Sequence, residues 1–271
     1  MPEQFAADWL ALREAADHAA RDTGLLQALH DWWPDTGYMQ ITDLGTGTGS
    51  NLRYLAPRLT GTQHWRLIDH DPALLERALA TAGTLPDDPG LHIQGECIDL
   101  HDDLESAVQG ADLVTASALL DLVSREWLDR LAACCAREGA AILIALSYDG
   151  RFEFTPAQAE DALIRRSVNA HQRGRKDMGM ALGPDAAKQA AQALAAAGYT
   201  VHLASSDWQL GPADPALQAA LINGWCAAAR EHNPAAEARI NAWEHSRIRQ
   251  GPADSLRVGH QDLLALPPCP A

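Results

Sequence analysis

The chain has 271 residues, 47% of them hydrophobic, which is enough to bury a sizeable core in one large domain or two small ones. Its 21 lysines and arginines stand against 36 aspartates and glutamates, a formal net charge of -15. Because nonspecific affinity for nucleic acids comes mostly from basic side chains, this balance argues against nucleic acid as a partner. The five cysteines are odd in number and lack C-x-x-C spacing, so we expect reduced thiols in a cytoplasmic protein and no metal site.

The N-terminal sequence MPEQFAADWLALREAADHAARD carries charges throughout and lacks the apolar centre of a signal peptide. The most apolar run, AAILIAL near Ala140, is far too short to span a bilayer. We therefore expect a soluble cytoplasmic protein with no membrane partner.

From about Glu3 to Trp33 the sequence predicts a helix, because apolar residues recur three and four positions apart. Short apolar strands then alternate with helical patterns. The predicted strands are Met39–Leu44, His64–Ile68, Leu91–Ile98, Asp112–Ala116 and Ala140–Leu146, and the helices between them are Leu52–Leu59, Pro72–Ala82, Leu104–Val108 and Arg125–Arg137. Strands and helices in turn, joined by short links, are typical of a parallel sheet covered on both faces.

A polar insertion from Ser147 to Pro184 interrupts this alternation. The predicted elements after it are a helix (Asp185–Ala197), a strand (Thr200–Ser205), two helices (Pro215–Glu231 and Pro234–Arg249) and a last strand (Leu256–Leu266). No repeat and no long linker marks a second domain.

The stretch DLGTGTGS follows the first strand and precedes a helix, which is the context that a nucleotide-binding loop requires. A dinucleotide fingerprint has the spacing G-x-G-x-x-G. Here the third glycine comes one position early, at Gly45, Gly47 and Gly49, and no Lys-Ser/Thr pair follows as in a Walker-type loop. The spacing therefore disfavours a nicotinamide oxidoreductase.

An acid two positions before the first of three alternating glycines resembles motif I of the class I S-adenosylmethionine-dependent methyltransferases, D/E-x-G-x-G-x-G. The resemblance implies an α/β fold with a doubly wound, mostly parallel sheet of seven strands. It also implies S-adenosyl-L-methionine as cofactor and S-adenosyl-L-homocysteine as product. Asp43 would place a negative charge near the ammonium and sulfonium groups of this ligand, and glycines let the main chain approach it closely.

The same resemblance predicts the residues around the nucleoside. Asp69 ends the second strand 20 residues after Gly49 and is expected to bind the ribose hydroxyls. Its alternative role is a helix cap, which Asp71 before Pro72 fits better. Asp99 and the amide of Leu100 are expected at the adenine, with Glu96 and Cys97 as the rival pair. The full set of predicted cofactor residues is Asp43, Gly45, Thr46, Gly47, Gly49, Asn51, Asp69, His70, Asp99, Leu100 and Ser117.

The fourth strand ends in ASALLD, not in the Asn/Asp-Pro-Pro-Tyr pattern of many enzymes that methylate nucleic acids or protein glutamine. With the acidic charge, this favours a small-molecule acceptor. In the insertion, SVNAHQRGRKDMG forms a basic patch that either binds an anionic group or is a solvated helix end. The predicted acceptor-binding residues are Trp9, Arg13, Leu119, Tyr148, Asn169, His171 and Arg173, with core packing as the alternative for Trp9.

Orientation alone can lower a barrier by about 7–11 kcal/mol, so methyl transfer does not demand a general base. If a base is used, His171 is the first candidate and His260 the second, and Tyr148 is placed to face the acceptor. The alternative for both histidines is that they are ordinary residues without a catalytic role.

We expect one methyltransferase domain, acting as a monomer or homodimer and transferring a methyl group by SN2 to O, N or S of a small molecule. Its expected parts are a helical cap (1–36), a cofactor-binding half (37–150), a substrate lid (151–183) and the remaining sheet with a helical insertion (184–271). Two alternatives stay open: a non-catalytic partner subunit that binds the cofactor, and an aminopropyltransferase-like use of the pocket. The second would need further acids, for which only Asp121 and Asp149 are candidates.

Overall fold

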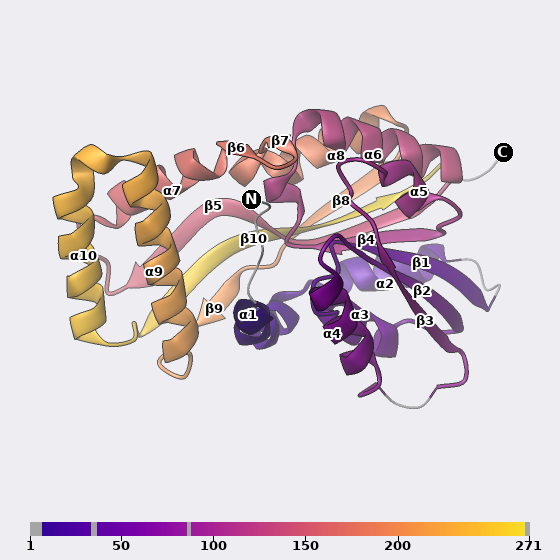
Figure 1. Ribbon diagram of the computed structural model, residues 1–271, viewed down its shortest axis with the longest axis horizontal. Coiled ribbons are helices and arrows are strands. Elements are labelled where there is room, and N and C mark those ends of the chain that lie inside the picture. The colour runs from indigo at the N-terminus through magenta and orange to yellow at the C-terminus, as the bar shows by residue number, and fades with distance from the viewer. Residues whose placement is uncertain (1–6, 34–36, 86–87, 269–271) are drawn as a thin grey trace.

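The computed structural model describes residues 7–33, 37–85 and 88–268 (Figure 1). The start of the expected N-terminal helix at Glu3 and the last cysteine, Cys269, lie outside these ranges. The strands of the main sheet are β1 (Tyr38–Leu44), β2 (Thr62–Asp69), β3 (Leu91–Cys97), β4 (Leu113–Ser117), β5 (Ala141–Thr155), β8 (Thr200–Ser205), β9 (Trp208–Leu210) and β10 (Ser255–Leu266). The helices are α1 (Ala7–Ala20), α2 (Thr23–Trp32), α3 (Ser50–Leu55), α4 (Pro72–Ala82), α5 (Leu104–Val108), α6 (Arg125–Glu138), α7 (Asp161–Gln172), α8 (Ala186–Ala196), α9 (Pro215–His232) and α10 (Glu237–Gln250).

The sheet has the strand order β3-β2-β1-β4-β5-β10-β8. The five strands from β3 to β5 in this order are parallel, and β10 runs antiparallel between β5 and β8. This confirms the predicted doubly wound, mostly parallel sheet of seven strands. The short β9, which pairs with β10 beside this path, was not predicted.

Helices cover both faces of the sheet, as the alternation of strands and helices predicts (Figure 1). On one face α5, α6 and α8 bury a core around Trp127, Leu131 and Leu194. On the other, α2, α3 and α4 bury a core around Leu29, Leu52 and Trp65. Because helices cover both faces of the sheet, a binding site is expected at the ends of the strands.

The N-terminal segment forms two helices, so the prediction of one helix was wrong. Between them Asp22 caps α2, because its side chain accepts a hydrogen bond from the Leu25 N–H at 2.8 Å. The backbone N–H of Asp22 also donates to Asp262 of β10, at 3.0 Å. These bonds turn the chain, and α1 then lies across the carboxyl ends of the strands.

The fifth strand continues nine residues beyond the predicted end at Leu146, to Thr155. It pairs with β10 on both sides of a register shift between Tyr148 and Phe152. Its side chains alternate, with Phe152 and Phe154 buried between exposed neighbours. The part of the insertion from Ser147 to Thr155 is therefore a strand. Its polar residues Arg151, Glu153 and Thr155 occupy exposed positions, whereas Ser147 is buried.

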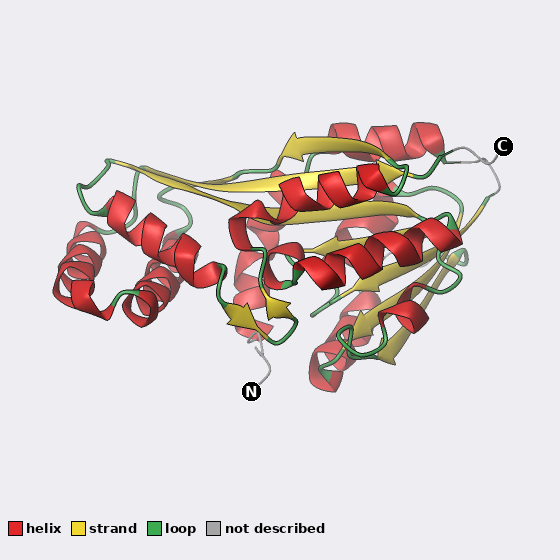
Figure 2. Cartoon of the chain, turned by 90° about the horizontal axis from the view of Figure 1, so that it is seen from above, coloured by secondary structure: helices red, strands yellow, loops and turns green. Residues whose placement is uncertain are grey.

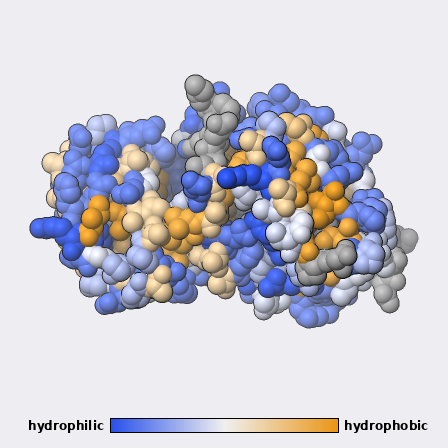
Figure 3. Space-filling view, turned by 60° about the horizontal axis from the view of Figure 1, so that its bottom comes forward, coloured by the Kyte–Doolittle hydropathy of each residue, from blue (hydrophilic) through white to orange (hydrophobic). Residues whose placement is uncertain are grey.

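The extended strands carry a helical lobe, here called the arm, made of residues 147–172 and 208–260. Figure 2 shows β5 and β10 running out of the main body to its helices. There α7, α9 and α10 bury a third core, in which Phe152 stacks on Trp225 with ring centroids 4.0 Å apart. The helices predicted between the last two strands are α9 and α10. In Figure 3 the arm forms a lobe beside the main body, and both show mixed polar and apolar surface.

No helix among the described residues is both long and apolar enough to cross a lipid bilayer.

Candidate active site

A cavity of about 250 Å³ lies at the carboxyl ends of β1, β2 and β4. This is the place where strand order reverses about β1, and ligands of open α/β sheets bind at such points. All of the predicted cofactor residues except Gly49 line it. The pattern of acids and glycines at strand ends therefore located this cavity.

The loop after β1 is built on glycines in the left-handed conformation, with φ of +56° at Gly47 and +80° at Gly49. The two have different surroundings. A Cβ on Gly47 would come 3.1 Å from the Leu10 side chain, at the cavity. A Cβ on Gly49 would come 3.3 Å from the Ala78 backbone, where α3 packs on α4. Gly47 therefore shapes the cavity, whereas Gly49 permits helix packing.

We expect Gly49→Ala to lower stability by about 1–3 kcal/mol, from the left-handed strain and the close contact, without altering ligand affinity in the folded protein. Gly47→Ala carries similar strain but is expected to weaken binding of S-adenosylhomocysteine as well, because it alters the cavity wall. Thermal melts and calorimetric titration of both variants check this. Equal affinities of the two variants would contradict the distinction.

Asp43 is a buried carboxylate that accepts hydrogen bonds from the glycine loop and from α3. Its oxygens accept hydrogen bonds from the Thr46 hydroxyl and the Asn51 amide, both at 2.7 Å. Burial raises its pKa to about 6, against these two hydrogen bonds and the charge of Arg21. Asn51 is fixed in turn, since its oxygen accepts from Arg21 at 2.8 Å. Asp43 thus positions the loop as well as adding negative charge to the cavity wall.

Asp69 ends β2, and its carboxylate faces the glycine loop across the cavity wall. One oxygen accepts the Gly47 N–H at 2.8 Å, and the other accepts the Asp71 N–H at 3.0 Å. Each carboxylate oxygen can accept a second hydrogen bond, so two further donors can be bound. Asp71 instead caps α4, accepting from the Ala73 N–H at 2.8 Å, as predicted for it.

The loop after β3 places Asp99 and Leu100 in the cavity wall. Asp99 accepts the His101 N–H at 2.8 Å, and the Trp127 indole donates to the Leu100 carbonyl at 2.8 Å. Both bonds fix the peptide group between Leu100 and His101. The rival pair does not line the cavity: Glu96 pairs with Arg66 at 2.8 Å, and Cys97 is the last residue of the strand.

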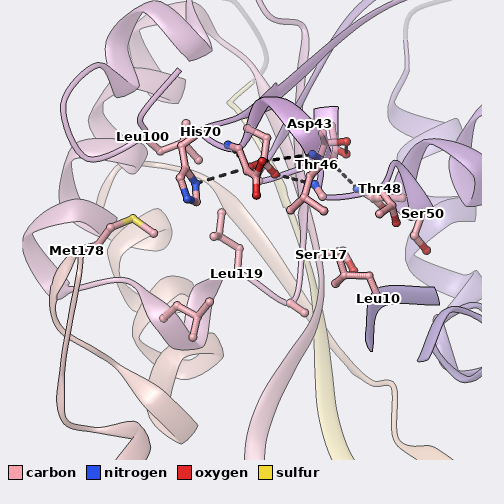
Figure 4. A pocket seen from close by; sticks show the side chains of 18 of the residues that line it. Leu10, Asp43, Thr46, Thr48, Ser50, His70, Leu100, Ser117, Leu119 and Met178 are labelled. Carbon is pink, nitrogen blue, oxygen red and sulfur yellow. Dashed lines mark hydrogen bonds and ion pairs between the residues drawn. The ribbon is translucent and has the colours of Figure 1, made fainter. Parts of the chain in front are cut away.

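Two further elements line the cavity, and only some of their residues were predicted to do so. On one side α1 contributes Leu10, Arg13 and Asp17. On the other, the hairpin of β6 (Arg175–Lys176) and β7 (Gly179–Met180) contributes Lys176, Asp177 and Met178. Figure 4 shows Met178 beside His70 and Leu100, across the cavity from Leu10 and Ser117. Leu10, Asp17 and Met178 carry no local motif that would have identified them.

Of the predicted acceptor residues, Leu119 and Arg13 line the cavity, whereas Trp9, Tyr148, Asn169, His171 and Arg173 do not. Those of the insertion have partners of their own. The Tyr148 hydroxyl donates to Asn169 at 3.0 Å, and burial raises the pKa of this tyrosine. Two basic residues of the patch have acidic partners, with His171 3.2 Å from Glu231 and Arg173 2.8 Å from Asp185, and of its basic residues only Lys176 lines the cavity.

The second candidate base, His260, is buried behind the cavity wall. It donates from Nδ1 to the Val258 carbonyl at 3.1 Å and packs on Trp208. Burial, with a smaller contribution from the Arg13 charge, lowers its pKa to about 3. The acids considered for a polyamine, Asp121 and Asp149, do not line the cavity either.

The low pKa of His260 predicts a loss of stability in mild acid. Between pH 6.5 and about 3 the unfolded chain binds a proton that the folded protein excludes, so stability falls as pH falls. From pH 6.5 to 5 the loss is about 2 kcal/mol. We expect urea unfolding of His260→Gln to lack this part of the pH dependence, and the exposed His202→Gln to retain it. Parallel pH profiles of wild type and His260→Gln would contradict the assignment.

No cluster of three or more His, Cys, Asp or Glu side chains among the described residues is arranged to hold a metal ion.

Sheet order, a glycine loop after β1 and an acid ending β2 define one class of proteins, the class I methyltransferases. Residues 42–141 match the family described as "Methyltransferase domain". Residues 42–141 thus carry a class I S-adenosylmethionine-dependent methyltransferase domain, which implies S-adenosyl-L-methionine as cofactor.

Two solved structures share the fold over nearly the whole chain. A cyclopropane-fatty-acyl-phospholipid synthase-like protein from Lactobacillus casei ATCC 334 is 16% identical, with a TM-score of 0.56 over 93% of this chain and 92% of that one. A putative methyltransferase from Bacillus halodurans C-125 is 13% identical, with a TM-score of 0.53 over 90% of this chain and 98% of that one. At these identities the likeness concerns the fold alone. Comparison with curated proteins finds no sequence match.

Proposed function

We propose that this methyltransferase acts on a small molecule and transfers the methyl group directly to an oxygen, nitrogen or sulfur atom. The observation that carries the proposal is the enclosure of the cavity. Strand ends, α1 and the β6–β7 hairpin all contribute to its wall, so donor and acceptor share a narrow space. A net charge of -15 also disfavours the phosphate backbone of a nucleic acid as substrate.

The residues present fit the cofactor. Gly45 and Gly47 let the main chain approach its amino-acid end, because a side chain at either would extend toward Leu119 or Leu10. Asp69 keeps two acceptor positions for the ribose hydroxyls. Asp99 and the Leu100 amide are assigned to the adenine, with Met178 closing that end (Figure 4).

When bound, S-adenosylmethionine would supply a methyl group on a positively charged sulfur. A lone pair of the acceptor would form a bond to the methyl carbon as the carbon–sulfur bond breaks, leaving S-adenosylhomocysteine, and a proton carried by the acceptor would pass to solvent. The residues of this chain hold and align the two reactants and exclude water from them. Ser117 and Leu119, at the end of β4, border the cavity beside the glycine loop and are assigned to the transfer position. Neither His171 nor His260 lines the cavity, so alignment is proposed to supply most of the rate.

Methyl transfer from labelled S-adenosylmethionine tests the proposal. The protein is incubated with a small-molecule extract, and separately with nucleic-acid and protein fractions of the same cells. We expect labelled product in the small-molecule extract alone, absent when Asp69→Ala replaces the wild type. Label confined to a macromolecular fraction would overturn the proposal on the acceptor.

A further inference from the structure

Arg13 of α1 is fixed in the cavity wall by Asp17 of the same helix and by Trp208, which is distant in sequence. Its Nε and Nη2 donate to the two oxygens of Asp17, at 2.9 and 3.1 Å. Asp17 is buried and also accepts the indole N–H of Trp208, at 3.1 Å. The guanidinium lies near two indole rings, with Cζ 5.1 Å from the centroid of Trp208 and 5.9 Å from that of Trp9.

This arrangement leaves part of the guanidinium available to a ligand. Asp17 uses two of its five N–H donors, and within the described residues Nη1 has no hydrogen-bond partner. The side chain is only 12% exposed and borders the cavity. Apart from Asp17, the other charged side chains of the cavity wall come from the strand ends and from the β6–β7 hairpin. A fixed, planar donor set of this kind matches the geometry of a carboxylate.

We propose that Arg13 binds a ligand carboxylate in this cavity, and that Asp17 and Trp208 are positioning residues that hold its guanidinium. The inference rests on the proposed cofactor site. Trp208 acts through Asp17: it lies on β9, the short strand that pairs with β10 of the arm. The arm therefore contributes to ligand binding without lining the cavity.

The favoured source of the carboxylate is the amino-acid end of the cofactor. Leu10, one helical turn before Arg13 on the same face of α1, lies against Gly47 of the loop assigned to that end. An acceptor that itself carries a carboxylate is the other source. The chemistry at Arg13 is the same for both, and the affinities for two nucleosides related to the cofactor distinguish them.

S-Adenosylhomocysteine carries the amino-acid carboxylate, whereas 5'-methylthioadenosine has the nucleoside and lacks it. We expect Arg13→Gln to weaken S-adenosylhomocysteine binding at least tenfold in calorimetric titrations and to leave 5'-methylthioadenosine binding within twofold. Trp208→Phe keeps an aromatic ring but removes the N–H donor to Asp17. It is expected to weaken S-adenosylhomocysteine alone, by about threefold, a selectivity that general loosening of the fold would not produce.

The chain offers a matched control for each variant. Arg125 pairs with Asp129 at the same helical spacing, on α6, and Trp243 donates its indole N–H to Asp161 in the arm, at 2.7 Å. None of these four residues lines the cavity. Arg125→Gln and Trp243→Phe should leave both affinities unchanged.

If Arg13 binds a carboxylate of the acceptor instead, the result differs. Arg13→Gln then keeps its affinity for S-adenosylhomocysteine. When it is incubated with labelled S-adenosylmethionine and a metabolite extract, it no longer forms the labelled products that bind to an anion exchanger. The proposal is overturned if the variant retains both, or if it weakens the two nucleosides equally. A wild-type protein that binds neither nucleoside would instead refute the cofactor site itself.

Discussion

Asp69→Ala is expected to weaken S-adenosylhomocysteine binding by about 100-fold. In the proposed complex two ribose hydroxyls donate to this carboxylate, and a hydrogen bond to a charged group is worth about 1.5–3 kcal/mol. Loss of two such bonds costs about 3 kcal/mol at the lower bound, which corresponds to about two orders of magnitude in affinity. The side chain also accepts the Gly47 N–H, so its removal loosens the loop on the same side of the cavity.

Asp71→Ala is the matched control, because this acid is two residues away and also lines the cavity. It caps α4, so its removal should lower stability by about 1 kcal/mol and change the affinity little. Asp69→Asn keeps one acceptor oxygen and should fall between wild type and Asp69→Ala. Titration calorimetry gives the affinities and thermal melts the stabilities. If Asp69→Ala binds as wild type does, the ribose has been assigned to the wrong acid.

The sequence was sufficient to predict the cofactor site, because the residues of that site follow a local pattern. A strand, a glycine loop and a helix follow one another within a few residues, and parallel strands place their carboxyl ends at one edge. With this edge, the resemblance to class I methyltransferases allowed Asp43, Asp69 and Asp99 to be assigned to one site without knowledge of side-chain contacts. The distinction between Gly47 and Gly49 could not be predicted, because it depends on whether Leu10 or Ala78 lies opposite.

The acceptor side depended on long-range contacts and was predicted less well. The alternation of Phe152 and Phe154 with polar residues was a readable sign of a strand, but the polar composition of the insertion obscured it. Trp208 and Asp17 are 191 residues apart, and no local pattern links them. The sequence showed the basic residues of the patch, yet Asp185 and Glu231, which pair with Arg173 and His171, come from other segments.

Asp161→Ala is expected to destabilise the protein by about 3–5 kcal/mol, because it leaves a buried cation without its counter-ion. Arg247 is only 4% exposed and donates to both oxygens of Asp161, at 2.6 and 2.7 Å. Its guanidinium also stacks on Phe154, with Cζ 3.8 Å from the ring centroid. The pair ties α7 to α10 at the far end of the arm. Removing both charges, in Asp161→Ala/Arg247→Met, should restore part of the loss.

Urea unfolding of this variant also tests the proposal that the chain is one domain. Because β5 and β10 are each one strand that extends from the sheet into the arm, we expect a single unfolding transition with a lower midpoint. Hydrogen exchange should then show α3 and α9 losing protection together, since they unfold in the same event. A loss confined to α7, α9 and α10 would mean that the arm unfolds separately. In that case the arm would be a second folding unit, and its unfolding would remove the hydrogen bond from Trp208 to Asp17, which holds Arg13 at the cavity.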